Sequence, residues 1–264
     1  SQDRLHSAFN GLDLELVGRG QGAEGTDEEG FRLNIVNALW GQEDHEFLAE
    51  FLDIVEENYV AGLRLLDFVN AAEDSRVVIN DWVSEQTEGR IEDLIPPGVI
   101  DGLTRLVLTN AIFFNAAWLY PFTESQTEDG AFHLLDGGEV TVPMMRRTAR
   151  FGLAKGDGYQ ALELPYDGGE LSMVILLPDT GQFEGFEGSM DADLVRTITE
   201  DLVPTRLALT MPKFEFDSAF GLRDTLGAMG MPVAFISSSG PCTSETADFS
   251  GMTGSCGLFV KEVV

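Results

Sequence analysis

Basic residues are scarce in this chain of 264 residues. Lysine and arginine number 16 against 45 acidic residues, and only Lys155, Lys213 and Lys261 are lysines. The net charge of −29 disfavours binding to nucleic acids or anionic membranes through a general electrostatic footprint. A salt-rich habitat and an ordinary acidic protein with arginine-favouring codon usage explain this charge equally well.

Long apolar runs are also absent. None approaches the roughly 20 residues of a membrane span, and the hydrophobic content of 44% is ordinary for a globular protein. We therefore expect a soluble chain, and we favour one large domain over two smaller ones. The amino end shows no basic, apolar and small-residue pattern of a secretory signal.

Cysteine is limited to Cys242 and Cys256, which lie in a region rich in Gly, Ser and Thr. No alternating cysteine framework accompanies them. The sequence therefore favours a pair of free thiols over a disulfide.

Catalytic and metal-binding motifs are missing as well. The histidines His6, His45 and His133 occur without HExxH, GxSxG or a Cys-x-x-Cys site, so we expect neither an active site nor a metal site. The GQGAEG stretch at 20–25 matches a dinucleotide-binding spacing. It lacks a preceding strand and a following helix, so an acidic loop is favoured.

An apolar run at Leu106–Phe114 lies at the centre of the stretch Leu103–Phe122. Its apolar residues are nearly continuous, which is typical of a strand covered on both faces, and a helix is disfavoured by the β-branched and aromatic content and by Pro121. We predict a central strand. Asn110 interrupts the run, so this pattern predicts either a buried amide with a specific partner or an Asn at a bulge.

Periodicity predicts the other elements. Apolar residues at helical spacing predict helices at Arg4–Leu16, Phe47–Asn58, Ala72–Thr87 (with Val77, Val78, Trp82 and Val83 facing inward), Val195–Leu202 and Phe220–Met229. Strand-like runs occupy Phe31–Trp40, Leu63–Phe68, Val140–Met145, Tyr159–Pro165, Leu171–Leu177 and Arg206–Phe216. Asp167-Gly168-Gly169 predicts a hairpin turn, and 236–246 predicts a loop.

These segments, in this order, resemble the serpins, a family of serine protease inhibitors that trap their targets by changing shape. The matching segments are FRLNIVNALWGQ at 31–42, VINDWVSEQTEGRIEDLIPPGVID at 78–101, LTRLVLTNAIFFNAAWLYPF at 103–122, VPMM at 142–145, GYQALELPYDGGELSMVILLPD at 158–179, LTMPKFEF at 209–216 and ADFSGM at 247–252. They cover nearly the whole chain. The NAAW sequence is most similar to bacterial members.

The resemblance implies an α+β fold with a large, mostly antiparallel central sheet, two smaller sheets and surrounding helices. It further implies one incomplete domain over residues 1–264. Arg4–Leu16 would be the fourth helix, and the first helices, the reactive loop and the last strands would lie outside this chain.

The implied activity is suicide inhibition of serine proteases, with cysteine proteases as a second target class, and not enzymatic catalysis. A cleaved loop would enter as a strand between Leu103–Phe114 and a strand beginning at Leu258. By resemblance, Asn110 falls at the shutter of the large sheet, with a His after Val264 as its usual partner. Trp118 and Lys213 fall at the breach where insertion starts. The resemblance also implies a monomer without cofactor, in an extracellular or periplasmic location.

Two other functional classes stay open at this point. A non-inhibitory serpin that serves as carrier, chaperone or storage protein fits the visible residues, and only the hinge of the reactive loop would discriminate. An unrelated hydrolase is the second class. A chain with 45 acidic residues offers glycosidase-like carboxylate pairs by chance.

Overall fold

The computed structural model describes residues 4–20, 31–59, 62–216, 218, 220–238 and 240–264. The chain divides into two compact units, unit 1 (1–18, 33–114 and 217–264) and unit 2 (19–32 and 115–216). Apart from Gly20, the stretch 20–25, for which an acidic loop is predicted, lies outside the described residues. A single domain over 1–264 stays a prediction.

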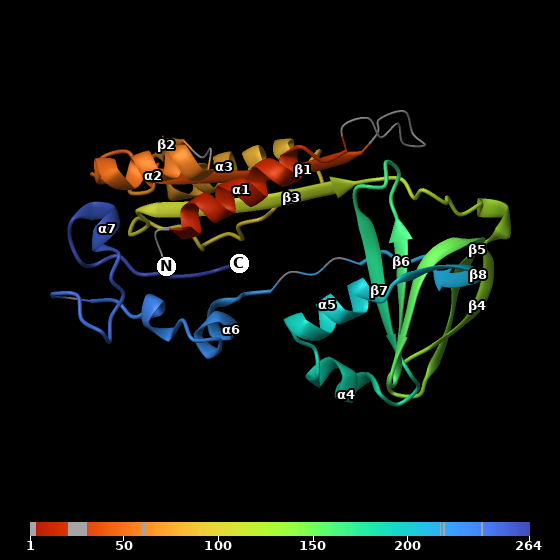
Figure 1. The fold of residues 1–264 in the computed structure, drawn as a ribbon. Coiled ribbons are helices and arrows are strands. Elements are labelled where there is room, and N and C mark those ends of the chain that lie inside the picture. Colours follow the sequence, from red (N-terminus) through yellow and green to blue (C-terminus); the bar gives the residue numbers. More distant parts are fainter. Residues whose placement is uncertain (1–3, 21–30, 60–61, 217, 219, 239) are drawn as a thin grey trace. The chain divides into compact units, whose positions relative to one another are not determined.

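Unit 1 contains a three-stranded sheet in the order β2-β1-β3, in which β1 and β2 are parallel with Leu39 opposite Leu63. Its elements, shown in Figure 1, are α1 (Leu5–Val17), β1 (Arg32–Gln42), α2 (Ala49–Tyr59), β2 (Leu63–Leu66), α3 (Ala72–Gln86), β3 (Leu106–Asn115), α6 (Arg223–Ala228), η3 (Pro232–Phe235) and α7 (Ser250–Thr253). Apart from the strand predicted from Leu258, the predicted helices and strands of this unit have the expected type. The strand expected from Leu258 onward is absent among the described residues, because 257–264 has no regular secondary structure.

The core of unit 1 lies between β1 and α3. Trp40 of β1, Ile79 of α3, and Phe68 from the segment between β2 and α3 are buried together. Trp82 of α3 contacts the Trp40 ring edge-on, with the ring centroids 5.5 Å apart. The predicted inward face of α3 was partly wrong. Val77 and Val78 are 41% and 45% exposed, because the buried stripe also contains polar side chains that an apolar pattern does not detect.

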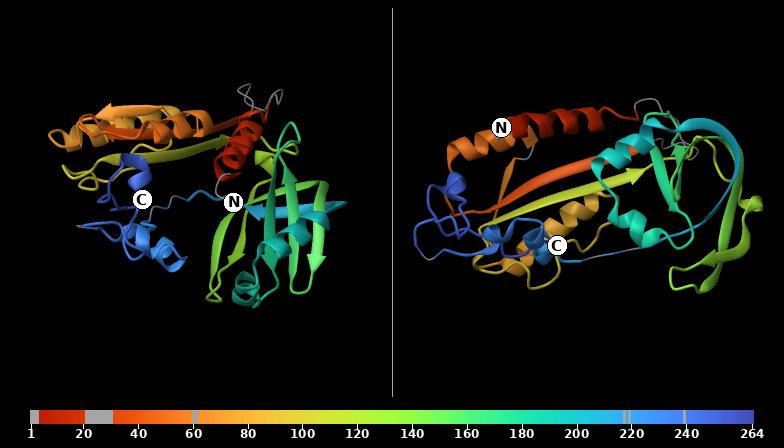
Figure 2. Two further views of the ribbon diagram at one scale, coloured as in Figure 1. Left: turned by 60° about the vertical axis from the view of Figure 1, so that its left-hand side comes forward. Right: turned by 60° about the horizontal axis from the view of Figure 1, so that its bottom comes forward.

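Unit 2 is an antiparallel sheet in the order β4-β5-β6-β7, with β8 paired to β5. Its elements are η2 (Glu124–Gln126), β4 (Glu128–His133), β5 (Glu139–Gly156), β6 (Tyr159–Pro165), β7 (Ser172–Pro178), α4 (Phe183–Gly188), α5 (Ala192–Glu200) and β8 (Val203–Pro212). Helices α4 and α5 lie on the same side of this sheet (Figure 2). Ile198 of α5 packs there with Ala154 of β5 and Ala161 of β6.

The strands of unit 2 follow the predicted order with different lengths. Strand β5 continues beyond Met145 to Gly156, and covered and exposed residues alternate from Met145 to Phe151. Strand β8 ends at Pro212, short of the predicted Phe216. The hairpin turn is confirmed, because Gly168 and Gly169 have φ angles of 86° and 69°, a conformation that glycine adopts without strain.

Candidate functional site: a groove beside β3

A groove of about 760 Å³ runs along β3 within unit 1. One side is formed by 103–110, which enters β3, and the other by 257–264; Phe249 and Met252 also line it. Consecutive residues of β3, and not every second residue, line the groove. This is the pattern of a strand edge and not of a sheet face.

Strand β3 is the last strand of its sheet among the described residues, where β1 pairs with its other side. An edge strand presents unpaired backbone N–H and C=O groups, which are a template for one more strand. The groove therefore offers unpaired backbone groups of β3 together with space for another strand beside them. The sequence had predicted a central strand buried on both faces. The burial of β3 instead alternates, and Leu108 and Ile112 are 66% and 56% exposed.

The backbone of 257–264 is held on the side of η3 and the segment entering α6. The Val260 N–H donates to the Ala234 carbonyl at 2.9 Å, and the Leu222 N–H donates to the Val263 carbonyl at 2.8 Å. The Arg223 side chain donates to the Lys261 carbonyl. These bonds leave the apolar side chains Leu258 and Phe259 lining the groove.

The Lys261 side chain links this segment to the loop before β3. Its Nζ lies 2.7 Å from Asp101 Oδ2 and donates to the Val99 carbonyl at 3.0 Å. The hydrogen bond from Lys261, followed by the Leu103 N–H, lowers the pKa of Asp101 below its usual value. The pair is half exposed, so it closes the groove with a weak and reversible contact.

Asn110 is exposed, and its Nδ2 donates to Asn37 Oδ1 on β1 at 2.8 Å. The prediction of a buried amide was therefore wrong, because β3 is covered on one face only. The buried polar residue is its neighbour Thr109, 4% exposed, whose Oγ1 accepts a hydrogen bond from Trp40 Nε1 at 3.1 Å. The shutter role of Asn110 stays a prediction.

Comparison with known proteins places this arrangement in a family. The model of the family described as Serpin (serine protease inhibitor) matches residues 1–264. The chain belongs to the serpin family. The prediction of an α+β serpin-like fold is thereby confirmed, and an emu ovalbumin structure superimposes on this serpin with a TM-score of 0.87 and 26% identity, over 97% of this chain and 64% of that one.

Curated relatives are considerably longer than this serpin. An uncharacterized serpin-like protein of Thermococcus kodakarensis is 39% identical over 234 residues, which are 89% of this chain and 52% of the relative. The leukocyte elastase inhibitor of Xenopus laevis is 37% identical over 98% of this chain and 67% of its own, and the human protein of that name is 34% identical over 99% and 68%. The chain thus spans about half to two thirds of these relatives.

The two predicted breach residues both lie in unit 2 of the serpin. Trp118 stacks on Tyr166 with centroids 4.6 Å apart, and burial raises the pKa of that tyrosine. Lys213 is exposed just beyond β8, and its N–H donates to the Pro143 carbonyl at 2.8 Å. Trp118 packs in the cluster that contains Met211, two residues before Lys213. Their role at the breach stays a prediction.

A polar clamp holds α3 to the segment that leads into β3. Asn80 bonds both backbone groups of Ile95, with Nδ2 donating to its carbonyl at 3.0 Å and Oδ1 accepting from its N–H at 2.9 Å. Arg76 Nη1 donates to the same carbonyl at 2.9 Å. The apolar pattern of α3 did not predict this pair. Arg76 and Asn80 are four residues apart on a helix, which is the signal that both lie on one face.

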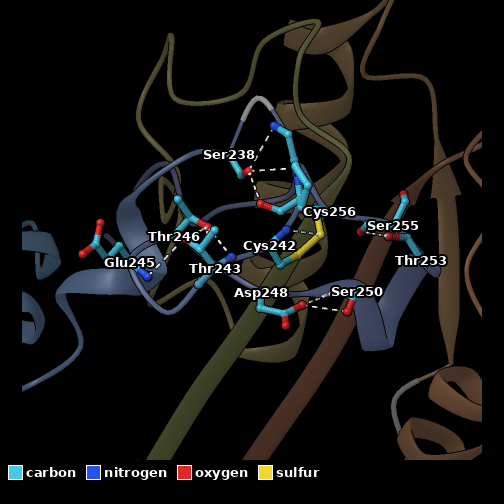
Figure 3. Close-up of a disulfide and its surroundings, with 12 residues drawn as sticks. Ser238, Cys242, Thr243, Glu245, Thr246, Asp248, Ser250, Thr253, Ser255 and Cys256 are labelled. Atoms are coloured by element: carbon cyan, nitrogen blue, oxygen red, sulfur yellow. Dashed lines mark hydrogen bonds between the residues drawn. A yellow bond between two sulfur atoms is a disulfide. The ribbon is translucent and has the colours of Figure 1, made fainter.

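The two cysteines of the serpin are joined in a disulfide, so the expectation of free thiols was wrong. The intervening loop folds back and brings their Cα atoms to 5.4 Å (Figure 3). Asp248 lies beside the sulfurs, but its carboxylate accepts hydrogen bonds from the Ser250 N–H and Oγ, at 3.1 and 2.6 Å. Sulfurs bonded to each other are not thiolate ligands, so this cluster does not form a metal site in the oxidised protein.

The histidines lie apart from one another in the described chain. His6 contacts the Tyr59 hydroxyl at 2.9 Å, and His133 lies 3.5 Å from Glu139 in an exposed pair. Burial, and then the charge of Arg105, lower the pKa of His45. None adjoins a serine or cysteine nucleophile among the described contacts. No helix that the structure describes is long and apolar enough to cross a membrane.

Proposed function

We propose that this serpin inhibits serine proteases by inserting its own cleaved reactive loop as a new strand along β3. The observation that carries this proposal is the open edge of β3 beside a groove of about 760 Å³. Membership of a family described as serine protease inhibitors, and similarity to proteins named leukocyte elastase inhibitor, support it. Cysteine proteases are a second target class.

Insertion has a clear driving force at this edge. A strand that pairs with β3 satisfies its unpaired backbone groups, and its side chains would pack beside Leu108, which lines the groove and is now 66% exposed. Burial of apolar surface contributes about 25 cal/mol per Å². The half-exposed Lys261–Asp101 pair spans this space and would have to separate or move, at a cost of about 1 kcal/mol or less.

Loop insertion would act on the protease at the stage of the acyl-enzyme. The protease serine attacks the loop carbonyl, the amine end of the cut loop departs, and an ester links the two proteins. Hydrolysis of that ester needs the oxyanion donors to be in place. Insertion would pull the ester away from them, so the covalent complex would persist.

The test uses the product of the complete gene, incubated with trypsin-, chymotrypsin- and subtilisin-like proteases. We expect a complex that resists SDS with at least one of them, and a higher melting temperature after the loop is cut. If every protease class simply digests the loop and the melting temperature does not rise, the inhibitor proposal fails. A non-inhibitory carrier, chaperone or storage role would then replace it.

We also propose that the protein is a monomer that works in an extracellular or periplasmic compartment. The Cys242–Cys256 disulfide supports this location, because such bonds persist mainly under oxidising conditions. Fractionation of the source cells, with gel filtration of the native protein, tests both statements. Recovery from the reducing cytosol or as a stable oligomer would contradict them.

A further inference from the structure

One exposed face of the β5–β8 ladder in unit 2 carries a stripe of arginines. Arg150 of β5 is directly opposite Arg206 of β8, and Arg146 lies one exposed position further along β5 from Thr148. Small or short side chains, Thr148, Ala208 and Thr210, occupy the remaining exposed positions between them. We define the arginine stripe as Arg146, Arg150 and Arg206.

The stripe is unusual for a protein of this charge. It gathers three of the 16 basic residues on two neighbouring strands of a chain whose net charge is −29. Glu128 of β4 pairs with Arg146 at 2.9 Å. Among the described residues, Arg150 and Arg206 have no acidic group within ion-pair distance, although the chain contains 45 acids.

The pair Arg150–Arg206 costs stability. Residues directly opposite in an antiparallel ladder have Cβ atoms about 5 Å apart, and like charges at that distance repel. Protection of an exposed strand edge from aggregation requires charge but not positive charge. Acidic side chains, which are almost three times as frequent in this chain as basic ones, would provide the same protection. The sign of the stripe is therefore unexplained by folding.

We infer that the arginine stripe is a docking surface for an acidic patch on the target protease, outside the region that the reactive loop contacts. This inference rests on the proposed function. Guanidinium groups form paired hydrogen bonds with carboxylates, and complementary charge mainly raises the rate of association. The loop would be recognised by its sequence, whereas the stripe would select proteases by their surface charge.

A compact protein fits this stripe better than a long polyanion. At physiological ionic strength the field of a charge decays over about 8 Å, so an acidic patch docked on the arginines is screened from most of the other charges. A flexible sulfated chain longer than the stripe would extend over surface belonging to a chain of net charge −29, and it would be repelled there.

The experiment measures the rate of complex formation for the product of the complete gene carrying Arg150→Glu and Arg206→Glu. The matched control carries Lys155→Glu and Arg196→Glu, two exposed residues of unit 2 outside the stripe, and changes the net charge equally. With the protease that reacts fastest, we expect the stripe variant to associate about tenfold more slowly at 0.05 M salt. The difference should shrink to less than about twofold at 0.5 M, where screening is strong.

The amount of SDS-resistant complex per protein should be the same in all variants, because loop insertion does not involve the stripe. Equal slowing by the control, or no slowing by the stripe variant, overturns the inference while the proposed function stands.

If the wild type forms no complex with any protease, the proposed function fails. A ten-residue glutamate peptide and a sulfated oligosaccharide then test the stripe directly. Binding of the peptide that is lost in the stripe variant supports an acidic protein partner. Binding of the oligosaccharide alone, or of neither probe, overturns it.

Discussion

Thr109 and Asn110 are neighbours on β3 with opposite surroundings, and they should respond differently to substitution. Thr109→Val removes the acceptor of the buried Trp40 indole N–H, so we expect a loss of about 1–3 kcal/mol in the free energy of unfolding. Asn110→Leu breaks an exposed bond to Asn37 and should cost less than about 1 kcal/mol. Urea denaturation measures both values. A larger loss for Asn110→Leu would show that this amide is buried in the folded protein in solution.

The Lys261–Asp101 pair should make the groove sensitive to pH. The folded-state pKa of Asp101 is lowered, chiefly by the hydrogen bond from Lys261. Its contribution to stability is therefore fully present above the unfolded pKa of about 3.9, and it is lost as the pH falls through the folded value. We expect Asp101→Asn to lower stability by about 0.5–1 kcal/mol at pH 7 and by nothing below the folded pKa of Asp101.

A double-mutant cycle separates this contact from other effects of the substitutions. Lys261→Met alone should cost about as much as Asp101→Asn, and the double variant should cost little more than either single one. The two single variants should also insert the cut loop faster, because each removes the Lys261–Asp101 contact across the groove. Fully additive losses would mean that the two side chains are not coupled.

The disulfide between Cys242 and Cys256 should stabilise the loop that leads into the groove segment 257–264. A disulfide across 14 positions stabilises by about 3 kcal/mol in the chain-entropy model. We expect a reducing agent to lower the free energy of unfolding by about this amount or less. It should also speed proteolysis of 257–264, which follows the bond directly. The variant carrying Cys242→Ser and Cys256→Ser serves as control, and its stability should not respond to reductant. A wild type that is equally stable with and without reductant would contradict the assigned role.

Sequence patterns identified these elements better than their surroundings. The apolar run at Leu106–Phe114 correctly predicted a strand, but the same run cannot tell whether a second face is covered, because that depends on segments far away in the chain. The buried stripe of α3 contains Arg76 and Asn80, which an apolar count treats as exposed. The disulfide depended on the path of a loop, and local sequence does not encode that path.

At the scale of the whole molecule, net charge should dominate the response to salt. A charge of −29 repels itself, and the Debye length falls from about 30 Å at 0.01 M to about 3 Å at 1 M. We expect the melting temperature to rise as NaCl is added over this range. Equimolar sucrose is the control for general solute effects. A flat or falling melting temperature would mean that the acidic residues are spread or paired well enough to need no screening.

Unit 2 depends on one strand to an unusual degree. Strand β5 pairs with β4 over Glu139–Met144, with β8 over Met144–Leu153 and with β6 over Gly152–Gly156. One inserted residue near Met144 would turn every later side chain to the opposite face, so Phe151 would point to solvent and Arg150 into the core. Loops absorb insertions more readily than strands do. Natural variation in chain length should therefore be confined to the loops, and the length of β5, eighteen residues, should stay constant.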